Sequence, residues 1–427
     1  MKVLVIGSGG REHALAWQAA KDPRVTEVFV APGNAGTAIE DKLTNVDIDV
    51  LALDALADFA KNNDVALTIV GPEAPLVAGL VDKFVELGLP VFGPTAGAAQ
   101  LEGSKAFTKD FLARHAIPTA DYQNFTEVEP ALAYLQEKGA PIVIKADGLA
   151  AGKGVIVAMT QAEAEEAVRD MLSGNAFGDA GCRVVIEEFL QGEEASFIVM
   201  SDGVNVLPMA TSQDHKRVGE GDTGPNTGGM GAYSPAPVVT DVVYQRAMDE
   251  VIMPTIRGME KEGYPFQGFL YAGLMIDETG APKVIEFNCR FGDPETQPIM
   301  LRLKSSLVEL CEAAVAGKLD TATIEWDQRP SLGVVLAAGG YPGNYGKGDE
   351  ITLPASLPEG IKIFHAGTKL VDGKVTTNGG RVLCVAAMGD SVKEAQERAY
   401  SACDQVSWNG MFCRRDIGWR AIAREEG

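Results

Sequence analysis

The chain has 427 residues, more than one ordinary hydrophobic core accommodates, so the sequence predicts several structural units. Apolar residues make up 46% of the chain, which is ample for packed interiors and excludes a disordered protein. Because 59 acidic residues oppose 37 basic ones, for a formal net charge of −22, the composition argues against a general nucleic-acid or anionic-membrane binder.

The N-terminal part alternates short apolar runs with helical patterns. Buried strands are predicted at residues 3–6, 27–30, 66–70 and 90–92. Apolar side chains recur at helical spacing in residues 12–21, 53–62 and 77–87. This rhythm predicts a doubly wound parallel sheet with helices on both faces.

A glycine-rich turn, IGSGGREHA, follows the first of these strands. Its glycines let backbone amides approach an anion at the start of a helix. A dinucleotide fingerprint fits poorly, because Glu12 stands where that motif needs a small residue and the expected ribose acid falls in the PGNAG loop. A phosphate-bearing substrate is favoured, and a tight turn without a ligand is the alternative.

Another loop, VGPEAPL, is predicted at the carboxyl end of the strand over residues 66–70, where parallel sheets form ligand crevices. Glu73 is placed there to bind sugar hydroxyls or an amine. The alternative is a turn that is shaped only by Pro72 and Pro75.

The middle of the chain predicts an α+β body with mostly antiparallel strands. Helices are expected at residues 105–115, 161–173 and 306–316, and strands at residues 141–145, 155–159, 184–190, 195–200, 269–276 and 283–288. A boundary is expected within residues 317–330. Beyond it, strands at residues 332–337, 361–366 and 381–387 and a helix at residues 392–404 predict a small α+β domain.

A lysine-bearing loop, KADGLAAGKGV, lies between two of these strands. Small residues let its amides approach phosphate oxygens, and two lysines supply positive charge. A P-loop is excluded, because three residues rather than four separate Gly148 from Gly152 and Gly154 follows Lys153. A strand–loop–strand flap over a nucleotide is favoured, with a flexible connection as the alternative.

Two further strands carry polar residues in specific patterns. VIEEFL places two acids inside an apolar run. A free strand edge at this place can pair with an adenine ring, and a nearby carboxylate can hold the ribose hydroxyls. In VIEFNCR, the period of two places Glu286, Asn288 and Arg290 on one face. Ile285 and Phe287 are expected to pack on the other face.

A carboxylate beside an amide oxygen suits magnesium, with nucleotide phosphates completing the octahedron. Arg290 on the same face can neutralise the charge that develops during phosphoryl transfer. The alternative for each strand is a solvated sheet face.

With these motifs in hand, the chain resembles the ATP-grasp ligases. Its motifs are similar from end to end to those of the phosphoribosylamine–glycine ligase family: VIGSGGREHAL, PGNAGT, GPEAPLV, GPTAGAAQLEGSKAFTKDF, SQDHKR, NTGGMGAYSP and EFNCRFGDPETQ. The resemblance implies an N-terminal substrate-binding domain over residues 1–103, an ATP-grasp domain over residues 104–325 with a flap at about 120–191, and a C-terminal domain over residues 326–427.

The resemblance also implies an activity: ATP-dependent ligation of glycine to 5-phosphoribosylamine through glycyl phosphate, in de novo purine biosynthesis, with Mg²⁺ or Mn²⁺. Arg290 and Lys145 are the implied catalytic residues, and Glu286 and Asn288 the metal ligands. The implied nucleotide contacts are Lys105, Lys145, Gly152, Lys153, Gly154, Glu187, Glu188, Leu190, Glu194 and Lys216. The implied substrate contacts are Gly9, Gly10, Asn34, Gly36, Glu73, Asp214, His215 and Asp293. The candidates for the glycine pocket are Asp214, His215 and Lys216, with residues 226–231.

Several rival functions remain open at this point. They are another carboxylate–amine ligase, an oxidoreductase built on the first domain, and a nucleotide sensor, whereas a carboxylase is disfavoured because no biotinyl-lysine segment is found. Six cysteines without a C-x-x-C pair disfavour zinc and disulfides. No signal pattern or apolar run of the ~20 residues of a membrane span is present, so a cytoplasmic protein, expected to be a monomer, is predicted.

Overall fold

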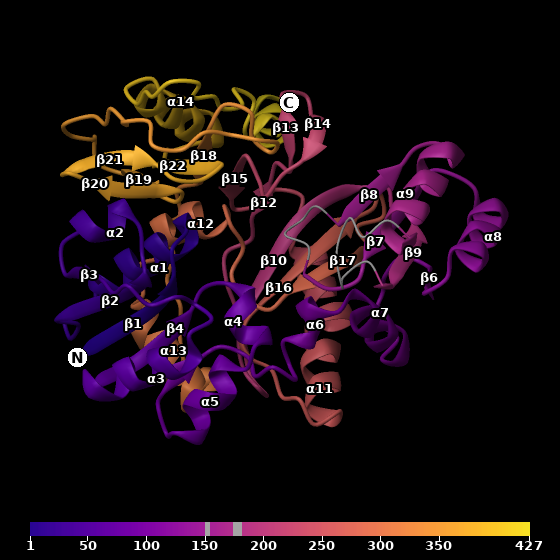
Figure 1. The fold of residues 1–427 in the computed structure, drawn as a ribbon, viewed down its shortest axis with the longest axis horizontal. Coiled ribbons are helices and arrows are strands. Elements are labelled where there is room, and N and C mark those ends of the chain that lie inside the picture. The colour runs from indigo at the N-terminus through magenta and orange to yellow at the C-terminus, as the bar shows by residue number, and fades with distance from the viewer. Residues whose placement is uncertain (150–153, 174–181) are drawn as a thin grey trace.

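The computed structural model describes residues 1–149, 154–173 and 182–427. Figure 1 shows the N-terminal sheet beneath the C-terminal one, the central strands beside them, and a small subdomain at the opposite end. Of the helices in the described residues, none is long and apolar enough to cross a membrane.

The N-terminal sheet has the strand order β3-β2-β1-β4-β5, and every pairing is parallel. Its strands are β1 (Lys2–Gly7), β2 (Glu27–Pro32), β3 (Leu43–Asn45), β4 (Val65–Val70) and β5 (Val91–Phe92). Its helices are α1 (Gly10–Ala20), α2 (Ala35–Ile39), α3 (Leu53–Asn62), α4 (Glu73–Val77) and α5 (Leu80–Glu86). The predicted doubly wound sheet is confirmed, because α1 packs on the face of Val3 and Val5 while α3 and α5 pack on the face of Leu4 and Ile6.

Two local predictions for this sheet need correction. The helix expected over residues 77–87 is divided into α4 and α5, because Gly79 has a φ of 93°, which a continuing right-handed helix does not contain. The short elements α2 and β3 were not predicted, since five and three residues are too few to show a period.

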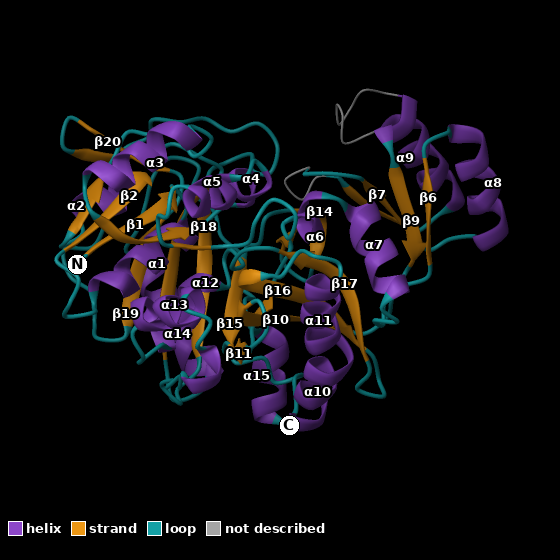
Figure 2. Ribbon diagram, turned by 90° about the horizontal axis from the view of Figure 1, so that it is seen from below, coloured by secondary structure: helices purple, strands orange, loops and turns teal. Residues whose placement is uncertain are grey.

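The flap subdomain forms a four-stranded sheet of order β6-β9-β7-β8. It contains β6 (Tyr122–Phe125), α8 (Val128–Lys138), β7 (Ile142–Ala146), β8 (Val155–Ala158), α9 (Gln161–Ser173) and β9 (Val184–Glu188). The two helices and the sheet bury a separate small core, and Figure 2 shows the subdomain set apart from β1–β3. Strand β9 pairs with β6 on one side and with β7 on the other, so a free strand edge begins only after Glu188. This corrects the prediction of a free edge over the whole VIEEFL run.

The central sheet is antiparallel, with the order β11-β10-β16-β17. Its strands are β10 (Glu193–Asp202), β11 (Val206–Pro208), β16 (Gln267–Ile276) and β17 (Pro282–Asn288). Around it lie α6 (Gln100–Gly103), α7 (Lys105–Arg114), α10 (Asp241–Arg246), a π-helical turn (Ala247–Ile252), α11 (Met253–Lys261), α12 (Thr296–Arg302), α13 (Leu307–Val315) and a 3-10 turn (Leu319–Thr321).

An irregularity in β17 changes which of its side chains are buried. The register shifts so that Gly273 pairs with Glu286 but Leu274 pairs with Val284, which leaves Ile285 as an extra residue. Phe287 is buried as expected, whereas Ile285 is only half-buried. The prediction that Ile285 packs with Phe287 on the face opposite Glu286 is therefore corrected, because the extra residue interrupts the period of two.

The C-terminal sheet has the order β12-β15-β18-β22-β19. Its strands are β12 (Gln213–Asp214), β15 (Gly231–Ser234), β18 (Ser331–Ala337), β19 (Ile361–His365) and β22 (Arg381–Met388). Two separate hairpins, β13 (Arg217–Gly219) with β14 (Thr223–Asn226) and β20 (Thr368–Val371) with β21 (Lys374–Thr377), and the helices α14 (Val392–Cys403) and α15 (Trp419–Glu426) complete this region. Because β12 and β15 come from the middle of the chain, the predicted boundary at residue 326 divides the sequence but not the sheet.

Candidate active site

A cavity of about 1130 Å³ lies between the flap, the central sheet and the N-terminal loops. This volume is ample for a nucleotide together with a small substrate. The predicted site residues that line it are Lys105, Lys145, Gly154, Glu187, Glu188, Leu190, Glu194, Lys216, Glu286, Asn288, Arg290, Glu73, Asp214, His215 and Asp293. Gly152 and Lys153 lie outside the described residues.

At the flap end of the cavity, two lysines surround a buried carboxylate. Glu187 is 3% exposed and forms ion pairs with Lys145 and with Lys109 of α7. Burial alone would raise the pKa of Glu187, but the two ammonium groups outweigh it and lower the pKa. Lys105 donates to the Gly148 carbonyl at 2.9 Å and so lies at the base of the lysine loop. These cations can bind phosphate oxygens.

The expected metal ligands lie side by side on β17. Asn288 donates through Nδ2 to Glu102 Oε1 at 3.0 Å and to the Phe287 carbonyl at 3.1 Å, so its Oδ1 is left to act as an acceptor. Within the described residues, the half-buried Glu286 carboxylate makes no hydrogen bond or ion pair. A carboxylate and an amide oxygen with spare lone pairs fit a hard divalent cation. No cluster of three or more acidic, histidine or cysteine ligands exists among the described residues, so phosphates would complete the shell.

Arg290 lies between two carboxylates from the N-terminal part of the chain. Its guanidinium is 3.3 Å from Glu73 Oε2 and 2.9 Å from Glu102 Oε1. Burial disfavours the charged form, but Glu102 and Glu73 outweigh it and raise the pKa of Arg290. The arginine is thus a fixed cation next to the metal-ligand pair.

Glu102 was not predicted from the sequence, yet it contacts three consecutive residues of the site. It accepts from Asn288 Nδ2, from the Cys289 amide at 2.7 Å and from Arg290. Burial raises the pKa of this carboxyl. Glu102 lies in α6, which is formed by four residues of the GPTAGAAQLEGSKAF motif. Its place within this motif was the signal in the sequence that could have indicated Glu102.

We expect Glu102→Gln to weaken metal binding by about tenfold to a hundredfold, because the expected ligand Asn288 loses the carboxylate that orients its amide. Calorimetric titration of Mn²⁺ into the ADP complex measures this, and kcat/KM should fall in parallel. Glu86→Gln, at an exposed position of α5, is the matched control. An unchanged Mn²⁺ affinity would exclude an orienting role for Glu102.

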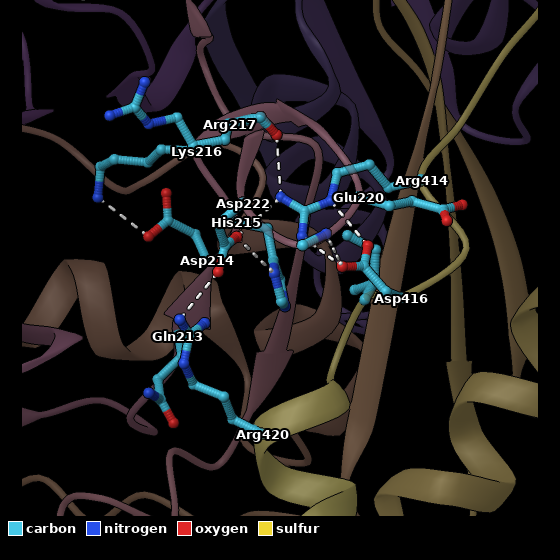
Figure 3. Close-up of polar contacts among 12 residues, drawn as sticks. Gln213, Asp214, His215, Lys216, Arg217, Glu220, Asp222, Arg414, Asp416 and Arg420 are labelled. Atoms are coloured by element: carbon cyan, nitrogen blue, oxygen red, sulfur yellow. Dashed lines mark hydrogen bonds and ion pairs between the residues drawn. The ribbon is translucent and has the colours of Figure 1, made fainter. Parts of the chain in front are cut away.

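Another group of predicted residues meets at the far end of the cavity. Lys216 Nζ lies 3.0 Å from Asp214 Oδ1 and 3.5 Å from Glu194 Oε2 (Figure 3 shows the first pair). His215 differs from its two neighbours, since its ring is almost fully buried and Nε2 accepts from the Gly418 amide at 2.9 Å. The imidazole thus accepts a hydrogen bond from the C-terminal segment while the residue also lines the cavity, and its contact with a substrate stays a prediction.

The N-terminal loops form a second, smaller cavity of about 290 Å³ against the C-terminal sheet. It is lined by Ser8, Gly9, Gly33, Asn34, Asp293, Tyr341, Ala366, Gly367, Thr368, Asn378 and Arg381. Arg381, which was also missed, donates to the carbonyls of Gly228 and Asp293 and lines both cavities. The signal in the sequence that could have indicated Arg381 was the glycine pair directly before it, Gly379 and Gly380.

The remaining N-terminal candidates lie against protein rather than cavity. A Cβ on Gly10 would come within 2.5 Å of the Gln297 side chain, and one on Gly36 within 2.5 Å of the His365 ring. Packing, rather than close approach of a substrate, accounts for these two glycines. Glu12 accepts from the Gly9 amide at 2.7 Å, so a carboxylate occupies the turn where a dinucleotide pyrophosphate would need free amides.

Comparison with known proteins agrees with this geometry. Three family models match: the phosphoribosylglycinamide synthetase N domain over residues 1–102, its ATP-grasp (A) domain over residues 103–296 and its C domain over residues 331–420. The fold and the site thus define an ATP-grasp ligase, a class that uses ATP and a divalent metal.

Relatives narrow the class further. The phosphoribosylamine–glycine ligases of Pseudomonas syringae and Escherichia coli are 75% and 73% identical to this chain, cover all of it, and are themselves covered to 99% and 100%. The crystal structure of the Thermotoga maritima ligase is 35% identical and has a TM-score of 0.85, with 98% of this chain and 100% of that one covered. A biotin carboxylase from Campylobacter jejuni, 15% identical with a TM-score of 0.71, shares the fold; the two chains are covered to 100% and 95%. The chain belongs to the phosphoribosylamine–glycine ligase family.

Proposed function

We propose that this enzyme joins glycine to 5-phosphoribosylamine at the expense of ATP, through a glycyl phosphate intermediate, and yields glycinamide ribonucleotide, ADP and phosphate. The observation that carries the proposal is the single cavity that brings nucleotide-binding lysines, the Glu286–Asn288 pair and the Asp214–Lys216 pair together. The family membership of the whole chain supports it.

The chemistry needs no nucleophile from the enzyme. A carboxylate is a poor electrophile, so a glycine oxygen first attacks the γ-phosphorus and the bond to ADP breaks. The amine of the sugar then attacks the acyl carbon, phosphate leaves with the C–O bonding pair, and the nitrogen loses a proton. The protein contributes positioning, charge neutralisation and exclusion of water from the acyl phosphate.

Each of these contributions is assigned to residues of the cavity. Lys105 and Lys145 hold the nucleotide phosphates, and Arg290 stabilises charge on the transferred phosphoryl group and the acyl phosphate. Glu286 and Asn288 would hold Mg²⁺ or Mn²⁺, which neutralises phosphate charge when it is bound. Asp214 and Lys216 suit the ammonium and carboxylate of glycine, because they carry the opposite charges.

The smaller cavity is assigned to the phosphoribosyl group. Gly9 and Asn34 line this cavity, and Arg381 offers the positive charge that a phosphate requires. Asp293 lines both cavities, so it lies where the sugar amine would meet the acyl phosphate. The net charge of −22 supports small molecules rather than nucleic acids as ligands. The monomeric state and the cytoplasmic location remain predictions.

An amino-acid panel tests the proposal. Purified enzyme with Mg-ATP should release ADP when glycine and phosphoribosylamine are both supplied. Alanine, serine and aspartate should support less than about a tenth of that rate, because even one additional methylene costs about tenfold or more in a fitted pocket. Equal or faster ADP release with another acid would overturn the assignment of glycine as the substrate.

A further inference from the structure

The hairpin formed by β13 and β14 follows directly after the substrate-binding pair Asp214 and Lys216. It pairs with no third strand in the described sheets, and residues 220, 221 and 223–225 are exposed. A two-stranded hairpin of this kind is at best marginally stable by itself. Contacts with other parts of the chain must therefore hold these two strands in place.

The last segment of the chain, residues 414–424, contacts this hairpin at both ends. Arg414 is 1% exposed and donates to the Arg217 carbonyl at 3.0 Å, at the start of β13, and to Asp222 Oδ1 at 3.0 Å, in the turn. Asp416 binds Arg414 through both oxygens at 2.8 Å and accepts from the Gly221 amide at 2.8 Å. Figure 3 shows this group between the hairpin and the C-terminal segment.

The contacts continue from the hairpin to the cavity wall. Asp222 also accepts a hydrogen bond from Arg420 at 2.8 Å. Arg424 donates to Glu193 at 2.8 Å, and Glu193 is the neighbour of the cavity residue Glu194. The Gly418 amide donates to His215 Nε2, so a neutral His215 carries its proton on Nδ1. Nδ1 faces Asp222 Oδ1 at 3.8 Å. The hydrogen bond from Gly418 thereby ties His215, the residue between Asp214 and Lys216, to the C-terminal segment.

A surface ion pair would contribute little to this arrangement, but Arg414 is not on the surface. Its guanidinium is buried, and its hydrogen bonds go to two carboxylates and a carbonyl with the fixed geometry of a fork. Without Arg414, the half-buried carboxylates of Asp222 and Asp416 would lose a charged partner, and the hairpin would lose two of its attachments to the C-terminal segment.

We propose that Arg414, together with residues 416–424, positions the β13–β14 hairpin so that Lys216 and Asp214 remain at the substrate end of the cavity. Arg414 is thus a positioning residue that acts through Lys216, and the end of the chain is a working part of the active site. This role rests on the proposed function only in that Lys216 must contribute to turnover.

A double-mutant cycle tests the coupling. Arg414→Ala should lower kcat/KM by about tenfold in the wild-type background and by less than about twofold in the Lys216→Ala background, because the residue through which it acts is already gone. Arg414→Lys, which keeps the charge, should recover part of the loss. Arg415→Ala is the matched control, since that side chain is exposed and pairs with Asp404 on α14.

Hydrogen exchange provides a readout without turnover. In Arg414→Ala, amides of residues 214–226 should exchange at least about tenfold faster, while those of the flap strands stay unchanged. If Arg414→Ala does not fold, Asp416→Asn serves in the same cycle, because it removes charge but keeps an acceptor for Gly221. Equal losses in both backgrounds, unchanged exchange at the hairpin, or the same loss in Arg415→Ala would overturn the proposal.

The cycle distinguishes this proposal from the assignment of the reaction. It is measured with whichever acid the wild-type enzyme activates in the amino-acid panel. A wild-type enzyme that prefers another acid would defeat the assignment of glycine, yet the coupling between Arg414 and Lys216 would still be measurable.

Discussion

Glu286→Gln should lower metal-dependent turnover by about a thousandfold while the protein remains folded. A neutral amide is a much weaker ligand for a hard cation than a carboxylate. The fold should persist, because within the described residues the Glu286 carboxylate has no ion pair whose partner would be left without a counter-charge. Turnover at saturating ATP, Mn²⁺ affinity in the ADP complex, and thermal unfolding together measure the effect.

Glu260→Gln on α11 is the control for this substitution, because Glu260 is exposed and distant from the cavity lining. It should leave turnover and Mn²⁺ affinity unchanged. If Glu286→Gln retained more than about a tenth of the wild-type rate, Glu286 would not be a metal ligand.

Arg290→Lys should lower kcat by about a hundredfold to a thousandfold with little effect on folding. Lysine keeps the charge between Glu73 and Glu102, but it cannot reproduce the planar fork of donors that fixes the position of that charge. The loss should appear in kcat more than in the KM for ATP, because the interaction strengthens only as charge moves during the transfer. Steady-state kinetics with both substrates saturating provide the measurement.

Arg290→Ala is expected to behave differently and serves as the comparison. It leaves two close carboxylates with no cation between them, which costs about 3–5 kcal/mol of folding free energy. Chemical denaturation should therefore separate the two variants, with Arg290→Ala unstable and Arg290→Lys close to wild type. A wild-type kcat in Arg290→Lys would show that charge alone, without the fork, is sufficient.

The strands and helices were largely predictable because their patterns are local. Residues 161–173 form a helix with the predicted bounds, and the buried strands of the first sheet agree within two residues. The failures came where one residue overrides the pattern. Gly79 divides a helix, and the extra residue Ile285 changes the face on which a side chain lies.

The sequence by itself determined the fold class, the family and the row of Glu286, Asn288 and Arg290, because glycine turns and a strand period of two express themselves within a few residues. Only the tertiary structure decided which distant groups meet: Glu102 from the end of the N-terminal part contacts that row, Arg381 from the last sheet contacts Gly228 and Asp293, and Arg414 contacts the hairpin. Such contacts join residues from 88 to 197 positions apart, and no local spacing encodes them. They depend on how separate sheets pack, and this packing also places the ring of His215 against the Gly418 amide.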